Sequence, residues 1–167
     1  MKTAVIVVGP EKSGTKMLTE CFVRSGWFGD YTHAQRLDNL DFRKTPERIV
    51  LRRSVPHGSH WLNYEEICQR LQYSNYRIKP VVIPRDHVME ANSQVRVGYA
   101  TSIDHAHERI SRAWMHIWKQ IPEAEVVLYE ALVGSEDYRQ RFFARWNLNP
   151  DMEFYDANSK YTGGGCE

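Results

Sequence analysis

The chain has 167 residues, with 22 Lys and Arg against 21 Asp and Glu and a formal net charge of +1. This is the length of one ordinary domain, so we expect a single core. The near-zero charge excludes a global field that would attract nucleic acid or an anionic membrane as partner, and any anion recognition must come from a local cluster.

Cysteine usage and the opening residues indicate the class of protein. The chain has three cysteines, widely spaced and outside any metal-ligand pattern: Cys21, Cys68 and Cys166. An odd number at this spacing favours reduced thiols in a reducing compartment, and we expect no metal site. The short apolar run at the start has no small-residue cleavage site after it, so we predict a strand there and not a signal peptide. No stretch approaches the ~18 apolar residues of a membrane helix. We therefore expect a soluble, cytoplasmic protein.

The first half of the chain alternates short apolar strands with helical spacing. Residues 4–8 form a β-branched run typical of a strand buried on both faces, and helical spacing follows at Met17, Leu18, Cys21 and Phe22. A polar, turn-rich stretch over 26–46 predicts a surface excursion. After it we predict a strand at 49–51, a helix at 64–71 and a strand at 80–83 that Pro84 interrupts.

The second half continues the same alternation. A helix is expected to start within 86–93, and apolar residues recur every three or four positions between 104 and 121, which predicts the longest helix. We predict a last strand at 125–129 and a last helix at 138–146. Residues 158–167 are glycine-rich and are interpreted as a mobile tail behind one domain, 1–157. Because parallel crossovers need helices on the faces of a sheet, the pattern predicts an α/β fold with three αβα layers and a central parallel sheet.

A glycine-containing segment joins the first strand to the first helix: Gly9-Pro10-Glu11-Lys12-Ser13-Gly14-Thr15-Lys16. Backbone N–H groups at a helix start favour an anion, and glycines let the chain curl around phosphate oxygens. In the nucleotide-triphosphatase pattern G-x-x-x-x-G-K-[ST], Thr15 stands where the lysine belongs and Lys16 where the metal-binding hydroxyl belongs. This favours a ligand without a metal-clamped triphosphate. A glycine turn without any ligand is the alternative.

The same segment resembles the 5′-phosphosulfate loop of the sulfotransferases. Their glycosaminoglycan members read G-x-x-[KR]-x-G-T, which Gly9 to Thr15 fits without a gap. Their cytosolic members read P-K-S-G-T-T, a form that Glu11 interrupts here.

A second motif supports the resemblance. Val81-Val82-Ile83-Pro84-Arg85 is followed eight positions later by Ser93. In the sulfotransferases an Arg and a Ser at this separation hold the 3′-phosphate of 3′-phosphoadenosine 5′-phosphosulfate. The planar fork of an arginine suits a phosphate, and a serine two helical turns onward can share it. The alternative is a surface Arg85 paired with Asp86 and an unrelated serine.

The resemblance implies a P-loop-like, sulfotransferase-type fold and activity. The chain would move a sulfuryl group from 3′-phosphoadenosine 5′-phosphosulfate to a hydroxyl or amine of an unidentified acceptor, leaving adenosine 3′,5′-bisphosphate, without a metal. By matching position, Lys12 would stabilise the leaving oxygen. The nucleotide-binding residues implied are Gly9, Lys12, Ser13, Gly14, Thr15, Lys16, Arg85 and Ser93.

The acceptor proton requires a general base, for which histidine is the usual choice. Cytosolic sulfotransferases carry K-x-H-x-P at the end of the second strand. With Pro56 laid on that proline, Arg52 replaces the lysine and Ser54 occupies the histidine position. We predict His57 as the base and His60 as the second candidate; a structural role for both is the alternative.

Two other functions remain open at this point. A kinase or nucleotide phosphotransferase using MgATP would need a metal-binding carboxylate such as Asp86 or Glu130. A nucleotide-binding or interaction module without turnover is the third option. The acceptor would be a small molecule or a glycan, and five Trp and nine Tyr are available to line its pocket or a homodimer face.

Overall fold

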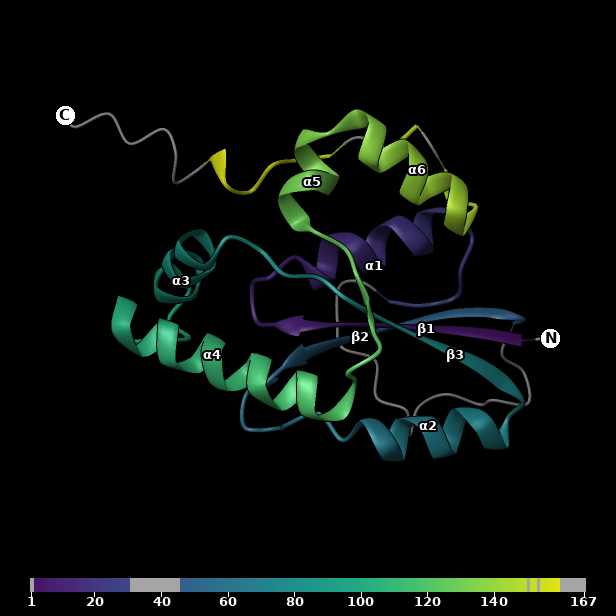
Figure 1. Ribbon diagram of the computed structural model, residues 1–167, viewed down its shortest axis with the longest axis horizontal. Coiled ribbons are helices and arrows are strands. Elements are labelled where there is room, and N and C mark those ends of the chain that lie inside the picture. The colour runs from purple at the N-terminus through teal and green to yellow at the C-terminus, as the bar shows by residue number, and fades with distance from the viewer. Residues whose placement is uncertain (1, 31–45, 150, 153, 160–167) are drawn as a thin grey trace.

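A parallel β-sheet forms the centre of the molecule (Figure 1). The structure, a computed structural model, describes residues 2–30, 46–149, 151–152 and 154–159. Within these residues the sheet has four strands in the order β2-β1-β3-β4, every neighbouring pair parallel. The strands are β1 (Lys2–Pro10), β2 (Arg48–Val55), β3 (Tyr76–Val82) and β4 (Glu125–Val126).

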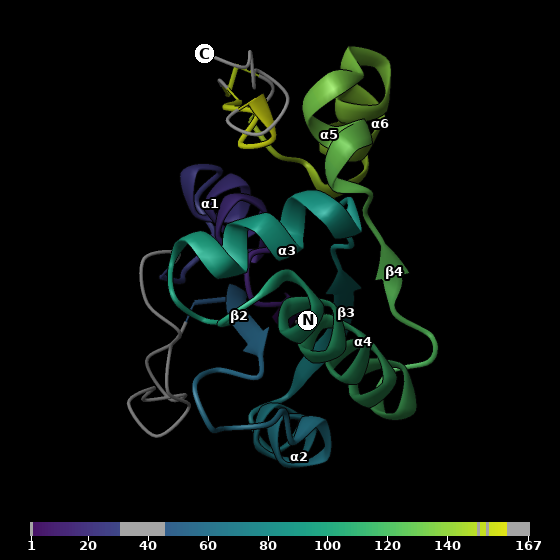
Figure 2. The same cartoon turned by 90° about the vertical axis from the view of Figure 1, so that its left-hand side faces the viewer.

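Helices cover both faces of the sheet, so the predicted α/β architecture with a parallel sheet is confirmed (Figures 1 and 2). On one face lie α1 (Thr15–Arg24), α5 (Tyr129–Gly134) and α6 (Glu136–Trp146). On the other lie α2 (Tyr64–Tyr73) and α4 (Ile103–Gln120). Helix α3 (His87–Arg96) packs on α4 beyond the carboxyl end of β3.

The central strand β1 divides the core because successive strand side chains point to opposite faces. Val5 and Val7 pack into the cluster that contains α1 and α6. Ala4, Ile6 and Val8 pack into the cluster with α2 and α4. All five side chains are fully buried, as the β-branched run predicts for a strand covered on both faces.

The register of the strands places three connections side by side. Gly9 pairs with Ser54 and Val8 with Val82, so β1, β2 and β3 end at nearly the same level. The carboxyl edge of an open parallel sheet is where such folds bind ligands. The segments that follow these strands, including loop 9–16, therefore meet at this edge.

The last strand is shorter than predicted. Only Glu125–Val126 form β4, and Tyr129 starts helix α5, where the sequence predicted the end of a strand and then a loop. The amides of Val127 and Tyr129 still donate to the carbonyl oxygens of Val82 and Pro84, at 2.9 and 3.0 Å. Since Pro84 breaks β3, the pairing continues as isolated hydrogen bonds and not as a regular ladder.

Two segments interpreted as surface or tail belong in part to the core. Trp27, in the predicted surface excursion 26–46, is 5% exposed and packs in the core, while residues 31–45, with His33, lie outside the described residues. Asn158, assigned to the tail, is 7% exposed and hydrogen-bonded; residues 160–167 also lie outside the described part. Among the described helices, none has the length and apolar character needed to cross a bilayer.

Candidate functional site

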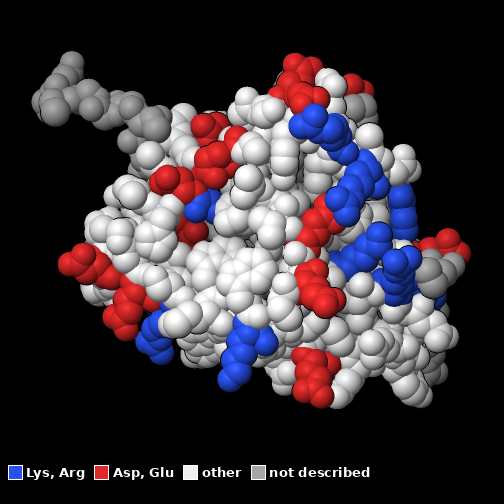
Figure 3. All heavy atoms as spheres, viewed as in Figure 1, with Lys and Arg blue, Asp and Glu red and all other residues white. Residues whose placement is uncertain are grey.

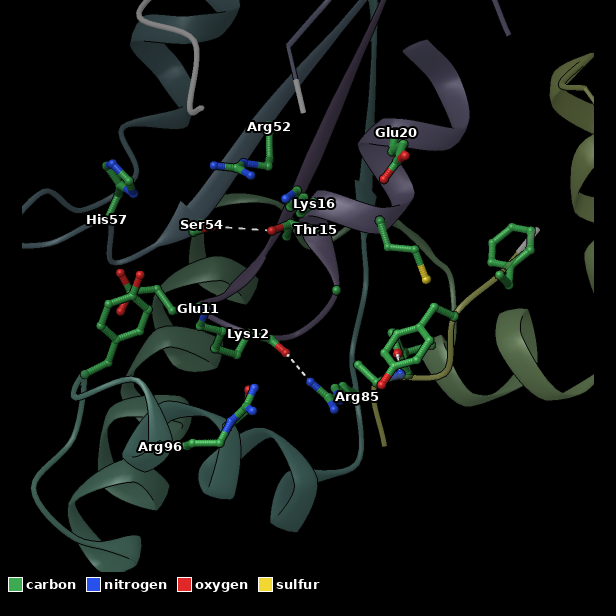
Figure 4. Close-up of a pocket in the computed structure, with 18 of the residues that line it drawn as sticks. Glu11, Lys12, Thr15, Lys16, Glu20, Arg52, Ser54, His57, Arg85 and Arg96 are labelled. Atoms are coloured by element: carbon green, nitrogen blue, oxygen red, sulfur yellow. Dashed lines mark hydrogen bonds between the residues drawn. The ribbon is translucent and has the colours of Figure 1, made fainter. Parts of the chain in front are cut away.

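A cleft of about 930 Å³ opens at the carboxyl edge of the sheet (Figure 4). Both sequence motifs line it, although they are about seventy residues apart in the chain. From loop 9–16 come Lys12, Gly14, Thr15 and Lys16, and from the second motif Arg85 and Ser93. The structure therefore brings the predicted binding residues together, with the exception of Gly9 and Ser13.

Loop 9–16 makes a tight turn with two residues in the left-handed region. Lys12 has φ = 74° and Gly14 has φ = 110°, and Ser13 N donates to Pro10 O at 3.2 Å. Gly14 is also the N-cap of α1, and no side chain of the described residues caps this helix. The first amides of α1 are therefore available at the cleft, where they favour an anion.

Gly14 is required for a second reason, which is its contact with Tyr129. A Cβ at Gly14 would lie 2.6 Å from Cδ2 of the Tyr129 ring. Arg85 also packs on Tyr129, and its guanidinium carbon lies 4.9 Å from the ring centroid. The buried Tyr129 ring thus contacts residues of both motifs, Gly14 and Arg85.

Arg85 connects the second motif to the loop directly. Its Nη1 donates to the carbonyl oxygen of Lys12 at 2.9 Å, and its Nε donates to Oδ1 of Asn158 at 2.7 Å. Arg85 is only 9% exposed, and its Nη2 has no hydrogen-bond partner among the described residues. The alternative of a surface arginine paired with Asp86 is wrong, because Asp86 instead caps α3 by accepting from Met89 N.

The segment after α6 forms another wall of the cleft. Asn158 Nδ2 donates to Glu130 Oε1 at 3.1 Å, and the same oxygen accepts from Asp86 N at 2.8 Å. Ala157 N donates to the hydroxyl of Tyr129 at 2.9 Å. Asn158 was missed by the sequence analysis because an asparagine beside a glycine-rich stretch carries no signal of a buried role.

Glu11, the residue that interrupts the cytosolic pattern, anchors the other side of the loop. It is 7% exposed; its Oε2 accepts from Arg109 Nη2 at 2.9 Å and its Oε1 from Gly58 N at 3.4 Å. Gln94 Nε2 donates to the carbonyl oxygen of Glu11 at 2.9 Å. The carboxylate therefore ties loop 9–16 to α4 and to the segment that carries His57.

The cleft is cationic although the chain is nearly neutral. Six of its lining residues are Lys or Arg and two are Glu: Lys12, Lys16, Arg24, Arg52, Arg85, Arg96, Glu11 and Glu20. Both glutamates are paired with arginines, Glu11 with Arg109 and Glu20 with Arg24. By contrast, basic and acidic side chains both occur on the face in Figure 3, around a broad uncharged area. An anion is thus drawn to the cleft by local charge.

Arg52 adds a charge that is partly withdrawn from water. Burial lowers its pKa, which indicates that the surroundings disfavour the isolated cation. The next cleft-facing residue of β2 is Ser54, whose Oγ lies 3.3 Å from Thr15 Oγ1. Ser54 stands where the cytosolic sulfotransferase pattern has a histidine, and here it forms a hydrogen bond with loop 9–16.

Of the two predicted bases, only His57 lines the cleft. The backbones of His57 and His60 pair with each other, N to O, at 2.9 and 3.0 Å, and both side chains are exposed. This short pairing fixes the turn that presents His57 (Figure 4). His60 lies outside the cleft wall.

Gly9 and Ser13 support the loop from inside. Ser13 is fully buried and its Oγ has no partner among the described residues. A Cβ at Gly9 would collide with that same Oγ. Both residues shape the loop sterically, and neither lines the cleft.

Tyr99, between α3 and α4, was not identified from the sequence. Its ring is 44% exposed and lines the cleft, and the Lys12 ammonium lies 5.2 Å from the ring centroid. A cation over an aromatic face is stabilised without being neutralised. The Tyr99 ring therefore helps to hold the Lys12 ammonium at the cleft.

Comparisons with known proteins provide no relative: no family model, curated protein or solved structure matches the chain.

Gly14→Ala is expected to lower the free energy of unfolding by about 1–3 kcal/mol from backbone strain alone, and further through the clash with Tyr129. The matched control is Gly98→Ala, which has φ = 78° but open space around the added Cβ. Urea unfolding of both variants measures the difference. Equal destabilisation would show that the contact with Tyr129 is unimportant.

Arg85→Lys is expected to speed hydrogen exchange of the amides of residues 11–15, because one ammonium cannot replace the guanidinium fork that holds Lys12 O and Asn158. Arg139→Lys is the control, since Arg139 also donates to backbone carbonyls, those of Leu132 and Val133, away from the cleft. Exchange rates in the loop that stay at the wild-type level in Arg85→Lys would refute the coupling.

Proposed function

We propose that the protein is a sulfotransferase that binds 3′-phosphoadenosine 5′-phosphosulfate in this cleft and transfers its sulfuryl group to a hydroxyl or amine. The observation that carries the proposal is that loop 9–16 and the Arg85–Ser93 pair line one cationic cleft. A nucleotide with anionic groups at both its 3′ and 5′ positions needs two anion subsites in one cavity. The two motifs supply one subsite each.

The donors of the cleft suit such a nucleotide. At the loop they are the amides at the start of α1, the Thr15 hydroxyl and the Lys12 ammonium. At the other subsite they are Ser93 and the Nη2 of Arg85, which is buried and has no partner within the described part of the chain. Charge-assisted N–H and O–H donors are strong partners for phosphate and sulfate oxygens.

The reaction assigns separate roles to Lys12 and His57. The bound donor supplies the sulfuryl group: the acceptor oxygen or nitrogen bonds to sulfur while the bond from sulfur to the bridging oxygen of the 5′-phosphate breaks. Lys12 stabilises the negative charge that develops on that bridging oxygen. His57 takes the proton that the acceptor loses.

The aromatic side chains of the cleft provide the apolar contacts. Tyr99, Phe154 and Tyr155 line it together with the charged residues. Planar rings of this kind can pack against a base, a sugar or an aromatic acceptor. We therefore propose a small molecule or a glycan as the acceptor.

Calorimetric titration tests the ligand class directly. Adenosine 3′,5′-bisphosphate is expected to bind at micromolar concentration in the presence of a metal chelator. Binding of MgATP alone would instead favour the phosphotransferase. If neither nucleotide binds, both activities are refuted.

Lys12→Ala is expected to reduce turnover with labelled donor by about 10²- to 10³-fold, the usual effect of losing one preorganised donor at a developing charge. Lys119→Ala, an exposed lysine of α4 outside the cleft, is the control and should retain wild-type turnover. Undiminished turnover in Lys12→Ala would remove the lysine from the reaction.

His57→Ala should lower turnover by about 10²- to 10⁴-fold, as expected for loss of a general base. His60→Ala, its backbone-paired neighbour outside the cleft, serves as the control and should leave turnover unchanged. The reverse ranking of the two variants would contradict the assignment.

A further inference from the structure

A buried carboxyl group lies beside the cleft and has no role in the proposed reaction. Glu90, on α3 one helical turn before Ser93, is 0% exposed. Neither of its carboxyl oxygens has a hydrogen-bond partner among the residues that the structure describes. Such an isolated carboxyl is unusual, because a buried polar group without partners is destabilising.

Two charged groups act on Glu90. Arg85 precedes α3 and favours the ionised form of Glu90, whereas Glu130 of α5 opposes it. Helix α4, which packs on α3, carries His107 and Arg109, and Arg109 binds Glu11 of loop 9–16. His107 contacts the His87 ring at 4.4 Å. Arg85 is thus the cation that acts most strongly on Glu90.

Burial is the main reason why Glu90 is protonated near neutral pH. It raises the pKa of Glu90 to about 8; the attraction of Arg85 lowers that pKa and the repulsion of Glu130 raises it. Protonated Glu90 carries no charge, so it does not offset the charge of Arg85, and Glu130 is the other charged group that acts on Glu90. Glu130 in turn is occupied by Asp86 N and Asn158.

We propose that Glu90 controls anion binding at the Arg85 end of the cleft: its protonated form leaves the Arg85 charge available to an anion, and its ionised form weakens binding. This inference rests on the anion-binding function proposed above and adds its regulation. Glu90 is a positioning residue in this scheme, since it does not line the cleft and acts through Arg85.

The geometry around Arg85 explains why anion binding there would respond to the ionisation of Glu90. Two guanidinium nitrogens are held by Lys12 O and Asn158, so the group cannot turn without breaking those bonds. Within the described residues Nη2 has no hydrogen-bond partner. An ionised Glu90 would oppose the anion because it offsets the charge of this one guanidinium. Conversely, a bound anion would stabilise the protonated form, because the coupling is reciprocal.

Inorganic sulfate is the most direct probe, because it stays a dianion across the pH range of interest. In wild type, sulfate affinity should fall by up to about tenfold between pH 7 and pH 9, which is the limit set by linkage to one proton with a pKa of about 8. Glu90→Gln should show no such fall. Glu136→Gln, an exposed residue of α6, is the control and should follow wild type.

A second measurement needs no variant. Calorimetry in buffers of different ionisation enthalpy should show uptake of about one proton per sulfate bound at pH 9, and almost none at pH 6. If uptake is absent, or if wild type and Glu90→Gln have the same pH profile, the inference is overturned. The absence of any sulfate binding would overturn it as well.

The proposed nucleotide donor can fail independently of this inference. Sulfate binding with the expected pH dependence, but no binding of adenosine 3′,5′-bisphosphate at any pH, would support the role of Glu90 and refute the donor. Nucleotide binding with a flat pH profile in wild type would do the opposite.

Stability gives an additional readout of the Glu90 proton. Its pKa is raised from 4.5 in the unfolded chain to about 8 in the fold, so the folded state holds the proton more tightly. Its contribution to the free energy of unfolding is therefore largest below pH 4.5, and it declines as pH rises toward 8. Glu90→Gln should lack this decline, and an identical pH dependence of unfolding in both proteins would contradict it.

Discussion

The hydrogen bond from Arg85 to the carbonyl oxygen of Lys12 is the constraint on which the cleft depends. It joins the end of β3 to the turn after β1, so neither motif can move without the other. The same guanidinium packs on the ring of Tyr129, and its Nε donates a hydrogen bond to Asn158 Oδ1. The ring of Tyr129 also leaves no space for a side chain at position 14. One aromatic residue therefore contacts both motifs of the cleft.

The electrostatic character of the cleft depends on which ionisable side chains are buried, and not on the net charge of the chain. The chain is almost neutral, but three buried ionisable groups lie at or beside the cleft, together with the exposed Glu130: Glu11, Arg85 and Glu90. Glu11 has an arginine partner, Glu130 accepts backbone and amide hydrogen bonds, and Glu90 avoids ionisation. As a result, Lys and Arg outnumber Asp and Glu among the residues that line the cavity, which is the arrangement an anionic ligand requires.

The sequence predicted the architecture well because β-branched runs and helical periodicity depend on burial alone. It also located both motifs, since glycines after a strand and an arginine at a strand end have local signatures. It could not locate Asn158 or Glu11 as anchors, nor Tyr99 as the partner of Lys12, because their roles arise from contacts between distant segments. Ser13 shows the converse: its position in the motif suggested a ligand, while packing beside Gly9 buries its hydroxyl.

The central claim is that one doubly phosphorylated nucleoside spans the cleft from loop 9–16 to the Arg85–Ser93 pair. Amide chemical-shift mapping by NMR during titration with adenosine 3′,5′-bisphosphate tests it most directly. A nucleotide that binds both motifs should cause saturable shifts in two separate groups, residues 12–16 and residues around 85 and 93, with one common dissociation constant. Shifts confined to a single motif, or centred on another surface, would contradict it.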